Sequence, residues 1–279
     1  MTKVARTAGV PITRTHQGVI ASHDLSTDRN FSENLARGLD VLRAFTAKEP
    51  ILSNREISER TGLPKPTISR LTYTLTLLGY LTRVEKLQKY RLAVGVLSLS
   101  YPLLASMPVR QIARPHLERI ARETRCTANL VMRDRLCVVY VDTCRVDGGN
   151  IYQPDIGSSR PLLCSAGGRA LLLACDPAER TAILNKIKVL DPEQYQRDKR
   201  FWDAEEKIYP SRGYTYSQGD WKKEIHAVAA PIRLPQREEA VALSCTMSGF
   251  RLGKDMFTKE IAPRMLEAVR QIEMSCGTI

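Results

Sequence analysis

The chain has 279 residues, enough for two ordinary domains with buried cores, and its hydrophobic (43%) and charged (26%) fractions are those of a globular protein. No apolar run approaches the roughly 18 residues that span a bilayer, and the first 26 residues lack the apolar stretch of a signal peptide, so we expect a cytoplasmic protein without a membrane partner. The formal net charge of +12 favours an anionic partner such as nucleic acid, and the excess of basic residues is densest before Ala105.

Seven cysteines lie between residues 126 and 276. Their number is odd and none forms a Cys-x-x-Cys pair, which predicts reduced, mostly buried thiols and not a disulfide framework or a zinc ribbon. No ligand pair at helical or knuckle spacing involves His226 or the cysteines, so the sequence predicts neither a metal nor a cofactor.

Residues 1–30 are rich in Thr, Ser, Arg and Gly and show no apolar periodicity, which predicts a mobile basic arm. Such an arm either lies along DNA or has no specific role, and both interpretations stay open. Ser32 then caps a predicted helix that ends before Pro50. The residues of its apolar face, at helical spacing, are Leu35, Leu39, Leu42 and Phe45.

A second helix is predicted from Ser53–Glu56, because Ser-Asn-Arg-Glu fits a capping box in which serine and glutamate each bond the other's backbone amide. Gly62 ends this helix. Pro64 and Pro66 fit the first turn of a third helix, where a missing amide hydrogen costs nothing. That helix runs toward Leu78, and the spacing of its apolar residues predicts burial of Ile68, Leu71, Leu75 and Leu78.

Two helices joined by a glycine-containing turn and followed by a basic hairpin are typical of a winged helix-turn-helix. The hairpin is predicted from strand-like segments at 81–83 and 90–92 with polar residues between them. The amino end of the third helix would meet base edges and phosphates, and the wing would hold phosphates. A helical hairpin that is merely solvated is the alternative, and the wing argues against it. The predicted DNA contacts are Arg37, Asn54, Arg55, Lys65, Pro66, Thr67, Ser69, Arg70, Tyr73, Arg83, Lys86 and Lys89.

The apolar residues of 92–107 predict a connecting helix that also packs against something, such as a second subunit. Pro108 breaks it, and a further amphipathic helix follows, in which Pro115 is expected to cause a kink. Strands are then predicted at 126–132 and 136–143, with a third at 150–153, and the segment 154–161 is expected to be a loop. The remaining predictions are helices at 165–175, 177–189, 201–209 and 258–275 and strands at 214–217, 226–232 and 240–246. This order predicts an α+β domain with an antiparallel sheet.

Few residues of this half suggest chemistry. Gly167 and Gly168 at a helix start either expose amides to an anion or allow a close helix–sheet contact. The hydroxyls of Ser244 and Thr246 share one strand face, where they either orient a ligand or satisfy one another. A nucleophile, base and orienting group were sought among Cys164, Ser165, Asp220 and His226, but no Gly-x-Ser-x-Gly or other catalytic spacing links them. The sequence therefore predicts no enzyme.

From about Ser32 to Gly277 the chain resembles the IclR family of bacterial transcriptional regulators, with matching blocks in the family's order and spacing. In the first half they are Ala36–Leu42, Thr61–Leu71, Leu78–Leu81 and Tyr90–Leu92. In the second half they are Ile156–Leu162, Ser165–Leu172, and Arg212–Tyr214 through Asp220 to Ala227–Pro231. The chain departs from the family in having Arg169 where many members have Gly or Lys, and Met247 where many have Gly.

The resemblance implies a winged helix-turn-helix, joined by a helix to an effector domain of GAF-like fold. Family members form dimers or tetramers, and their effectors are small molecules, often organic acids or aromatic catabolites. The family's effector positions correspond here to Ala166, Gly167, Asp220, Ala227, Ser244 and Thr246.

The sequence thus predicts a transcriptional regulator that binds a double-stranded DNA operator as a homodimer or homotetramer under the control of a small organic-acid or aromatic-catabolite effector. Its predicted parts are an arm (1–30), a winged helix-turn-helix (31–92), a linker helix (93–107) and an effector-binding domain (108–279). Two alternatives are a DNA-binding protein without an effector and a metabolite-processing enzyme with a DNA-binding appendage. Binding of a metabolite, or its turnover, would separate them.

Overall fold

The computed structural model describes residues 28–146, 154–235, 240–249 and 255–277. The chain divides between Ala105 and Ser106 into two compact units. Most of the predicted arm, and the strand predicted at 150–153, lie outside the described residues.

The first unit combines helices with a small antiparallel sheet whose strand order is β1-β3-β2. Val41, Ile57 and Ile68, from three different helices, meet in its core. The elements in chain order are α1 (Glu33–Arg43), β1 (Ile51–Leu52), α2 (Asn54–Thr61), α3 (Lys65–Leu77), β2 (Leu81–Val84), a 3-10 turn (Glu85–Leu87), β3 (Lys89–Leu92) and α4 (Gly95–Ala105).

The predicted signals around α2 and α3 are confirmed. The Ser53 hydroxyl accepts from the Glu56 amide at 3.2 Å, and the Glu56 carboxylate accepts from the Ser53 amide at 2.7 Å. Gly62 ends α2 with φ 74°, a left-handed conformation that glycine adopts without strain. Pro64 is the residue before the first turn of α3 and Pro66 lies within that turn. These local bonds fix the turn between the two helices.

The predicted apolar faces of α1 and α3 need correction. Leu35 and Leu39 are exposed, and the buried residue of α1 is Val41, because the helix turns that face toward the core. Leu78, expected to be buried, is 62% exposed, since α3 ends at Leu77 and the chain turns away at Gly79.

The second unit is built on a six-stranded antiparallel sheet with strand order β6-β5-β4-β9-β8-β7. The predicted α+β class is confirmed. The strands are β4 (Thr127–Asp134), β5 (Cys137–Cys144), β6 (Ser159–Pro161), β7 (Thr215–Gln218), β8 (Ile225–Ile232) and β9 (Val241–Ser248). The helices are α5 (Pro108–Thr124), α6 (Ala166–Ala174), α7 (Pro177–Leu190), α8 (Pro192–Arg212) and α9 (Ala262–Ser275), the last preceded by a π-helical turn (Met256–Ile261).

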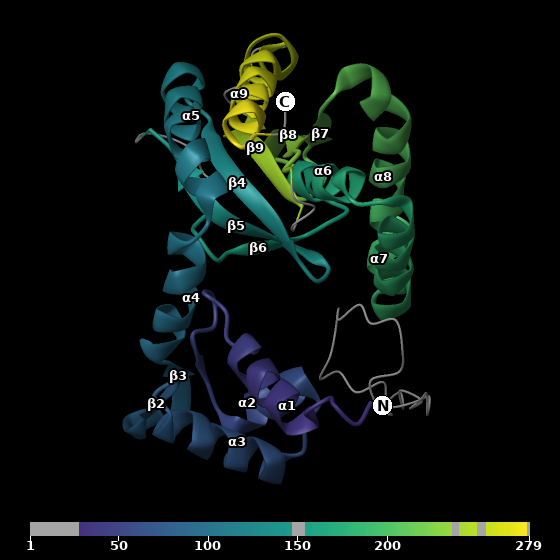
Figure 1. Ribbon diagram of the computed structural model, residues 1–279. Coiled ribbons are helices and arrows are strands. Elements are labelled where there is room, and N and C mark those ends of the chain that lie inside the picture. Colours follow the sequence, from purple (N-terminus) through teal and green to yellow (C-terminus); the bar gives the residue numbers. More distant parts are fainter. Residues whose placement is uncertain (1–27, 147–153, 236–239, 250–254, 278–279) are drawn as a thin grey trace. The chain divides into compact units, whose positions relative to one another are not determined.

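Helices cover both faces of this sheet. α5 and α9 lie on one face, and α6, backed by α7 and α8, lies on the other (Figure 1). Leu171 of α6, Ile183 of α7 and Trp202 of α8 join sheet residues such as Val138 and Ala229 in one buried cluster. This cluster holds α6 against the sheet, and a cavity lies beside the first turn of α6.

Two predictions about the second unit are wrong in detail. The segment expected to be a loop before Pro161 contains strand β6, in which Arg160 pairs with Val138 of β5. α8 begins at Pro192, well before the predicted residue 201. α5 continues through Pro115, which lies on its exposed side, and the kink expected there stays a prediction.

Candidate nucleic-acid interface and ligand cavity

The first turns of α3 present a polar surface. The helix buries Ile68, Thr72 and Leu75 against the core, which leaves the opposite side to solvent. Tyr73 is 66% exposed. Basic and short polar side chains at a helix amino end suit both phosphates and base edges. Of the remaining α3 residues predicted to contact DNA, Thr67 is half-buried and the exposed ones are Lys65, Pro66, Ser69 and Arg70.

The residues predicted at α1 and α2 are engaged within the protein. The Asn54 amide group donates to the Ser69 hydroxyl at 3.2 Å and accepts from the Thr72 hydroxyl at 3.3 Å, so it links α2 to α3. Arg55 and Arg37 each form an ion pair with a glutamate four residues away along their own helix, at 2.8 and 3.0 Å. Asn54 therefore positions α3 relative to α2.

The wing is the β2–β3 hairpin. Its tip carries Lys86, which is exposed, while Arg83 hydrogen-bonds the Gln88 side chain across the hairpin. Lys89 donates to the Glu56 carboxylate at 3.0 Å. Hydrogen bonds from the Ser53 hydroxyl and amide, followed by the bond from Lys89, lower the pKa of Glu56 to about 2. The wing is thus tied to the first turn of α2.

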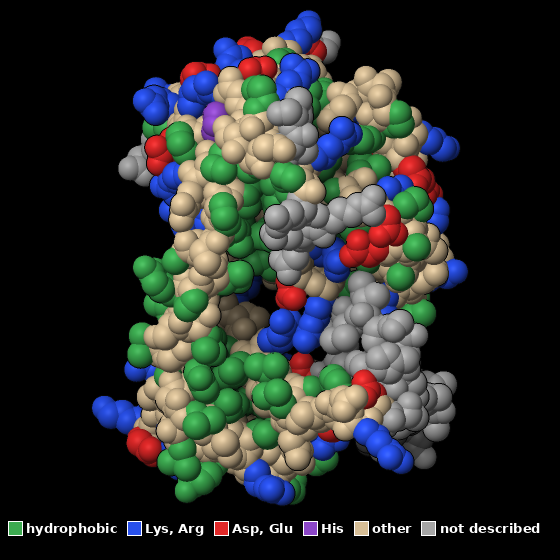
Figure 2. Space-filling model, viewed as in Figure 1, with side chains coloured by type: hydrophobic (Ala, Val, Ile, Leu, Met, Phe, Trp, Pro, Cys, Tyr) green, Lys and Arg blue, Asp and Glu red, His purple; other side chains and the backbone are tan. Residues whose placement is uncertain are grey.

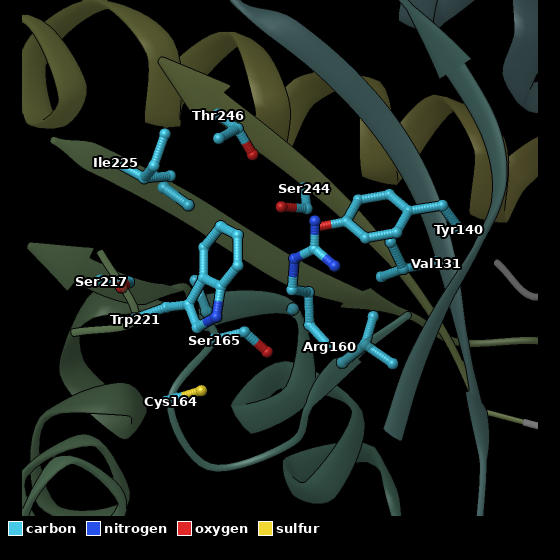
Figure 3. A pocket seen from close by; sticks show the side chains of 14 residues that line it. Val131, Tyr140, Arg160, Cys164, Ser165, Ser217, Trp221, Ile225, Ser244 and Thr246 are labelled. Atoms are coloured by element: carbon cyan, nitrogen blue, oxygen red, sulfur yellow. The ribbon is translucent and has the colours of Figure 1, made fainter. Parts of the chain in front are cut away.

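A cavity of about 30 Å³ lies in the second unit between α6 and the sheet. Figure 3 shows side chains from β4, β5, β6, β8, β9 and the loop after β7 converging on it. The cavity is lined by Val131, Val138, Tyr140, Arg160, Cys164, Ser165, Ala166, Gly167, Ser217, Trp221, Ile225, Ala227, Ser244 and Thr246.

Five of the six predicted effector residues lie together in this lining, namely Ala166, Gly167, Ala227, Ser244 and Thr246. The sixth, Asp220, does not line the cavity. Its carboxylate accepts from the guanidinium of Arg169 at 2.8 Å. Arg169 is fully buried and also donates to the carbonyls of Leu163 and Tyr216, at 2.9 and 2.7 Å. The Arg169–Asp220 pair anchors the loop after β7 to α6.

The two glycines at the start of α6 have different roles. A Cβ on Gly168 would lie 2.1 Å from the Leu162 carbonyl oxygen, so only glycine permits this close backbone approach. Gly167 lines the cavity, and a Cβ there would lie 3.2 Å from Cγ2 of Val131. The close helix–sheet contact that the sequence offered as one explanation applies to Gly167, which packs against Val131 of β4 and also lines the cavity, whereas Gly168 packs against the Leu162 backbone before α6.

Several lining residues were not predicted. Val138 and Tyr140 alternate along β5 and could have been found from that alternation. Arg160 was missed because its segment was expected to be a loop, and Trp221 because the loop after β7 carries no periodic signal.

The residues considered for catalysis are not arranged for it. Ser165 caps α6, where its hydroxyl accepts from the Gly168 amide at 3.1 Å and donates to the Pro161 carbonyl. His226 points to the other sheet face from its neighbours Ile225 and Ala227 and stacks on Phe257. Burial raises the pKa of Cys164 to about 12, so the thiol stays protonated near neutral pH. Serine and histidine therefore lie on opposite faces of the sheet.

In the part of the chain that the structure describes, no cluster of three or more His, Cys, Asp or Glu side chains is arranged to hold a metal ion. No described helix is long and apolar enough to cross a membrane.

A winged helix-turn-helix followed by an α+β unit is the architecture of a DNA-binding protein with a second domain that holds a cavity. Residues 34–85 match the IclR helix-turn-helix domain, and residues 102–274 match the family described as bacterial transcriptional regulator IclR C-terminal. The chain belongs to the IclR family, whose members are DNA-binding transcriptional regulators and not enzymes.

Similar proteins agree with this assignment. The HTH-type transcriptional regulator TsaQ1/TsaQ2 of Comamonas testosteroni is 31% identical over 198 residues, 70% of this chain and 71% of that protein. The crystal structure of an IclR-family regulator from Brucella abortus has a TM-score of 0.84 and 35% identity and covers 94% of this chain and 97% of its own. An IclR homolog from Microbacterium hydrocarbonoxydans, crystallised with 4-hydroxybenzoate, shares the fold with a TM-score of 0.65 and 24% identity, over 88% of this chain and 100% of its own.

Proposed function

We propose that this regulator binds its operator under the control of a small organic acid or aromatic catabolite, which occupies the cavity beside α6. The observation that carries the proposal is the convergence of Ala166, Gly167, Ala227, Ser244 and Thr246 on one internal cavity. Small side chains leave space, and the hydroxyls offer hydrogen bonds to a polar substituent. The 4-hydroxybenzoate complex of the Microbacterium hydrocarbonoxydans homolog supports an aromatic acid. Asp220 would act indirectly, by holding the loop after β7 through Arg169.

In this proposal the α3 surface reads the operator within the major groove. Lys65, Thr67, Ser69 and Arg70 would meet base edges and phosphates near the amino end of the helix, with Pro66 and Tyr73 beside them. Arg83 and Lys86 would hold phosphates from the wing, and Lys89 would do so while it also fixes the wing to α2. Asn54 would position α3, and Arg37 and Arg55 would contribute positive charge near the DNA backbone.

We further propose that the regulator works as a homodimer or homotetramer in the cytoplasm, where it meets the chromosome. α4 supports an assembled state, because none of its residues is buried within the chain although most are apolar. Figure 2 shows hydrophobic side chains along this segment. Its most exposed large apolar residues are Leu97, Leu99, Tyr101 and Leu103. A second copy would cover such a stripe, and the effector would then bias the arrangement of the two DNA-binding units through residues 93–107.

The test is a screen of small acids and neutral metabolites by thermal shift, followed by calorimetry on the compounds that raise the melting temperature. We expect at least one organic acid to bind the wild-type protein and to bind the Ser244→Ala, Thr246→Val double variant more weakly. Equal affinity for both proteins would move the effector site away from the cavity. A screen without any acid that binds would favour a DNA-binding protein without an effector of this class.

A further inference from the structure

The rim of the effector cavity carries a cation stacked on an aromatic ring. Arg160 of β6 lies opposite Val138 of β5, and directly opposed residues of antiparallel strands point to the same face of a sheet. Both side chains line the cavity. The guanidinium carbon of Arg160 is 4.2 Å from the centroid of the Trp221 ring, which is a cation–π contact. Figure 3 shows the guanidinium reaching inward, between Trp221 and Tyr140.

The described part of the cavity lining carries a single kind of charge, a positive one. Among the described residues that line the cavity, Arg160 is the one whose side chain is charged at neutral pH. The others are aliphatic, aromatic or hydroxyl-bearing, apart from the protonated thiol of Cys164. A planar guanidinium in an uncharged wall attracts an anion and matches a carboxylate with two parallel hydrogen bonds. The wall therefore selects for negative charge at one position.

Arg160 is the adjustable part of this lining. It is half-buried, and its side chain is long and flexible. Val131 and Ala166 are buried, and a Cβ on Gly167 would lie 3.2 Å from Cγ2 of Val131. A ligand that pairs with the guanidinium would therefore displace it from the Trp221 ring.

We propose that Arg160 and Trp221 together recognise a flat monocarboxylate, an inference that rests on the proposed effector function. The carboxylate pairs with the guanidinium, and the flat body of the ligand takes its place against the Trp221 ring. The small side chains of Ala166 and Ala227 also line the cavity and leave room for a planar group. A substituent at the far end of the ligand reaches the hydroxyls of Ser244 and Thr246. Arg160 would thus determine the specificity of the cavity for an acid.

The experiment compares acids with their neutral amides. Benzoate, the hydroxybenzoates and furoate, each paired with its amide, are titrated by calorimetry into the wild-type protein, Arg160→Gln and Lys222→Gln. Lys222 is a matched control, since its Nζ lies 4.6 Å from the centroid of the same Trp221 ring but the side chain does not line the cavity. Tryptophan emission is recorded in parallel, because Trp202 is buried in the core and Trp221 borders the ligand.

We expect at least one acid of this set to bind the wild-type protein and to change Trp221 emission. Arg160→Gln should lower the affinity for that acid by about 10- to 100-fold, the range for a lost charge-assisted hydrogen bond. The affinity for the corresponding amide should change little. Lys222→Gln should leave the acid's affinity unchanged. Equal affinity of the acid for wild type and Arg160→Gln would overturn the inference and leave the effector function standing. Failure of these flat acids to bind, when other acids from the wider thermal-shift screen do bind, would also overturn the inference and leave the effector function standing. Failure of every acid in both experiments would remove the proposed effector function itself.

Discussion

Lys89 in β3 donates to the carboxylate of Glu56 in the first turn of α2, with Nζ and Oε1 3.0 Å apart. The same carboxylate closes the capping box with Ser53. One glutamate therefore starts the helix and fixes the wing beside it. If the wing and α3 contact the same stretch of DNA, as we propose, this bond between the wing and α2 reduces the entropy lost on binding by holding the wing in place beforehand.

Replacing Glu56 with Gln should make the stability of the first unit less dependent on pH between pH 7 and pH 2. The pKa of Glu56 lies at about 2 in the folded protein, below its ordinary 4.5, so the stabilisation is fully present above pH 4.5 and is lost as the pH falls toward 2. We expect Glu56→Gln to be less stable than wild type at pH 7, with a difference that shrinks toward pH 2, as measured by urea unfolding. Glu59→Gln, which removes only an exposed ion pair with Arg55, should show almost no difference at either pH. A difference in stability between wild type and Glu56→Gln that stays constant from pH 7 to pH 2 would contradict the lowered pKa of Glu56.

Replacing Arg70 with Ala should weaken specific operator binding by about 1–3 kcal/mol, because an exposed arginine at the amino half of α3 is placed to read a base. The measurement is fluorescence anisotropy with operator DNA at fixed salt. Lys86→Ala, which removes a charge at the wing tip, should weaken operator and random DNA alike. If Arg70→Ala bound operator as tightly as wild type, α3 would not be the reading helix.

Gly168 and Gly38 should respond in opposite ways to alanine. The Cβ of Gly168→Ala would lie 2.1 Å from the Leu162 carbonyl oxygen, so the backbone must shift, at a cost of about 1–3 kcal/mol in stability. Gly38 lies within α1 with nothing inside 4 Å of a built Cβ, and Gly38→Ala should stabilise by about 0.5–1 kcal/mol. Thermal unfolding of both variants measures the two effects. A neutral Gly168→Ala would show that the approach of α6 to Leu162 is not fixed.

Replacing Asp220 with Asn should destabilise the second unit by about 3–5 kcal/mol, because it leaves the fully buried guanidinium of Arg169 without its counter-charge. The double variant with Arg169→Met should lose less than the sum of the two single changes, as a double-mutant cycle by urea unfolding would show. Additive losses would mean that the two side chains act independently and would contradict the anchoring role of the pair.

The parts of the fold that depend on contacts between residues close in sequence were predictable. Ser53, Glu56 and Gly62 bond within their own turns, and so the turn between α2 and α3 could be read directly. The two-residue strand β1 was not, because Ile51 gains its conformation by pairing with Arg91, forty residues later. α8 carries a readable start, since Asp191 caps it, but few apolar residues mark its first turns.

The same division holds for the cavity. Gly167 follows from the helix start, and Ser244 and Thr246 follow from the alternation of β9, whereas Ala166 and Ala227 come from the family resemblance. Arg160 enters the lining only because β6 pairs with β5, a contact that no local pattern encodes. The position of the Arg160 guanidinium in the lining therefore could be found only from the structure.

We propose that a small acid bound in the second unit changes the affinity of the first unit for DNA. The most direct measurement is an operator-binding isotherm by anisotropy, with and without the acid that calorimetry identifies, for wild type and the Ser244→Ala, Thr246→Val variant. We predict a change in the operator dissociation constant of about 5- to 150-fold for wild type, the usual range of allosteric coupling, and a much smaller change for the variant at the same acid concentration. An acid that binds wild type by calorimetry and leaves its operator isotherm unchanged would contradict the account.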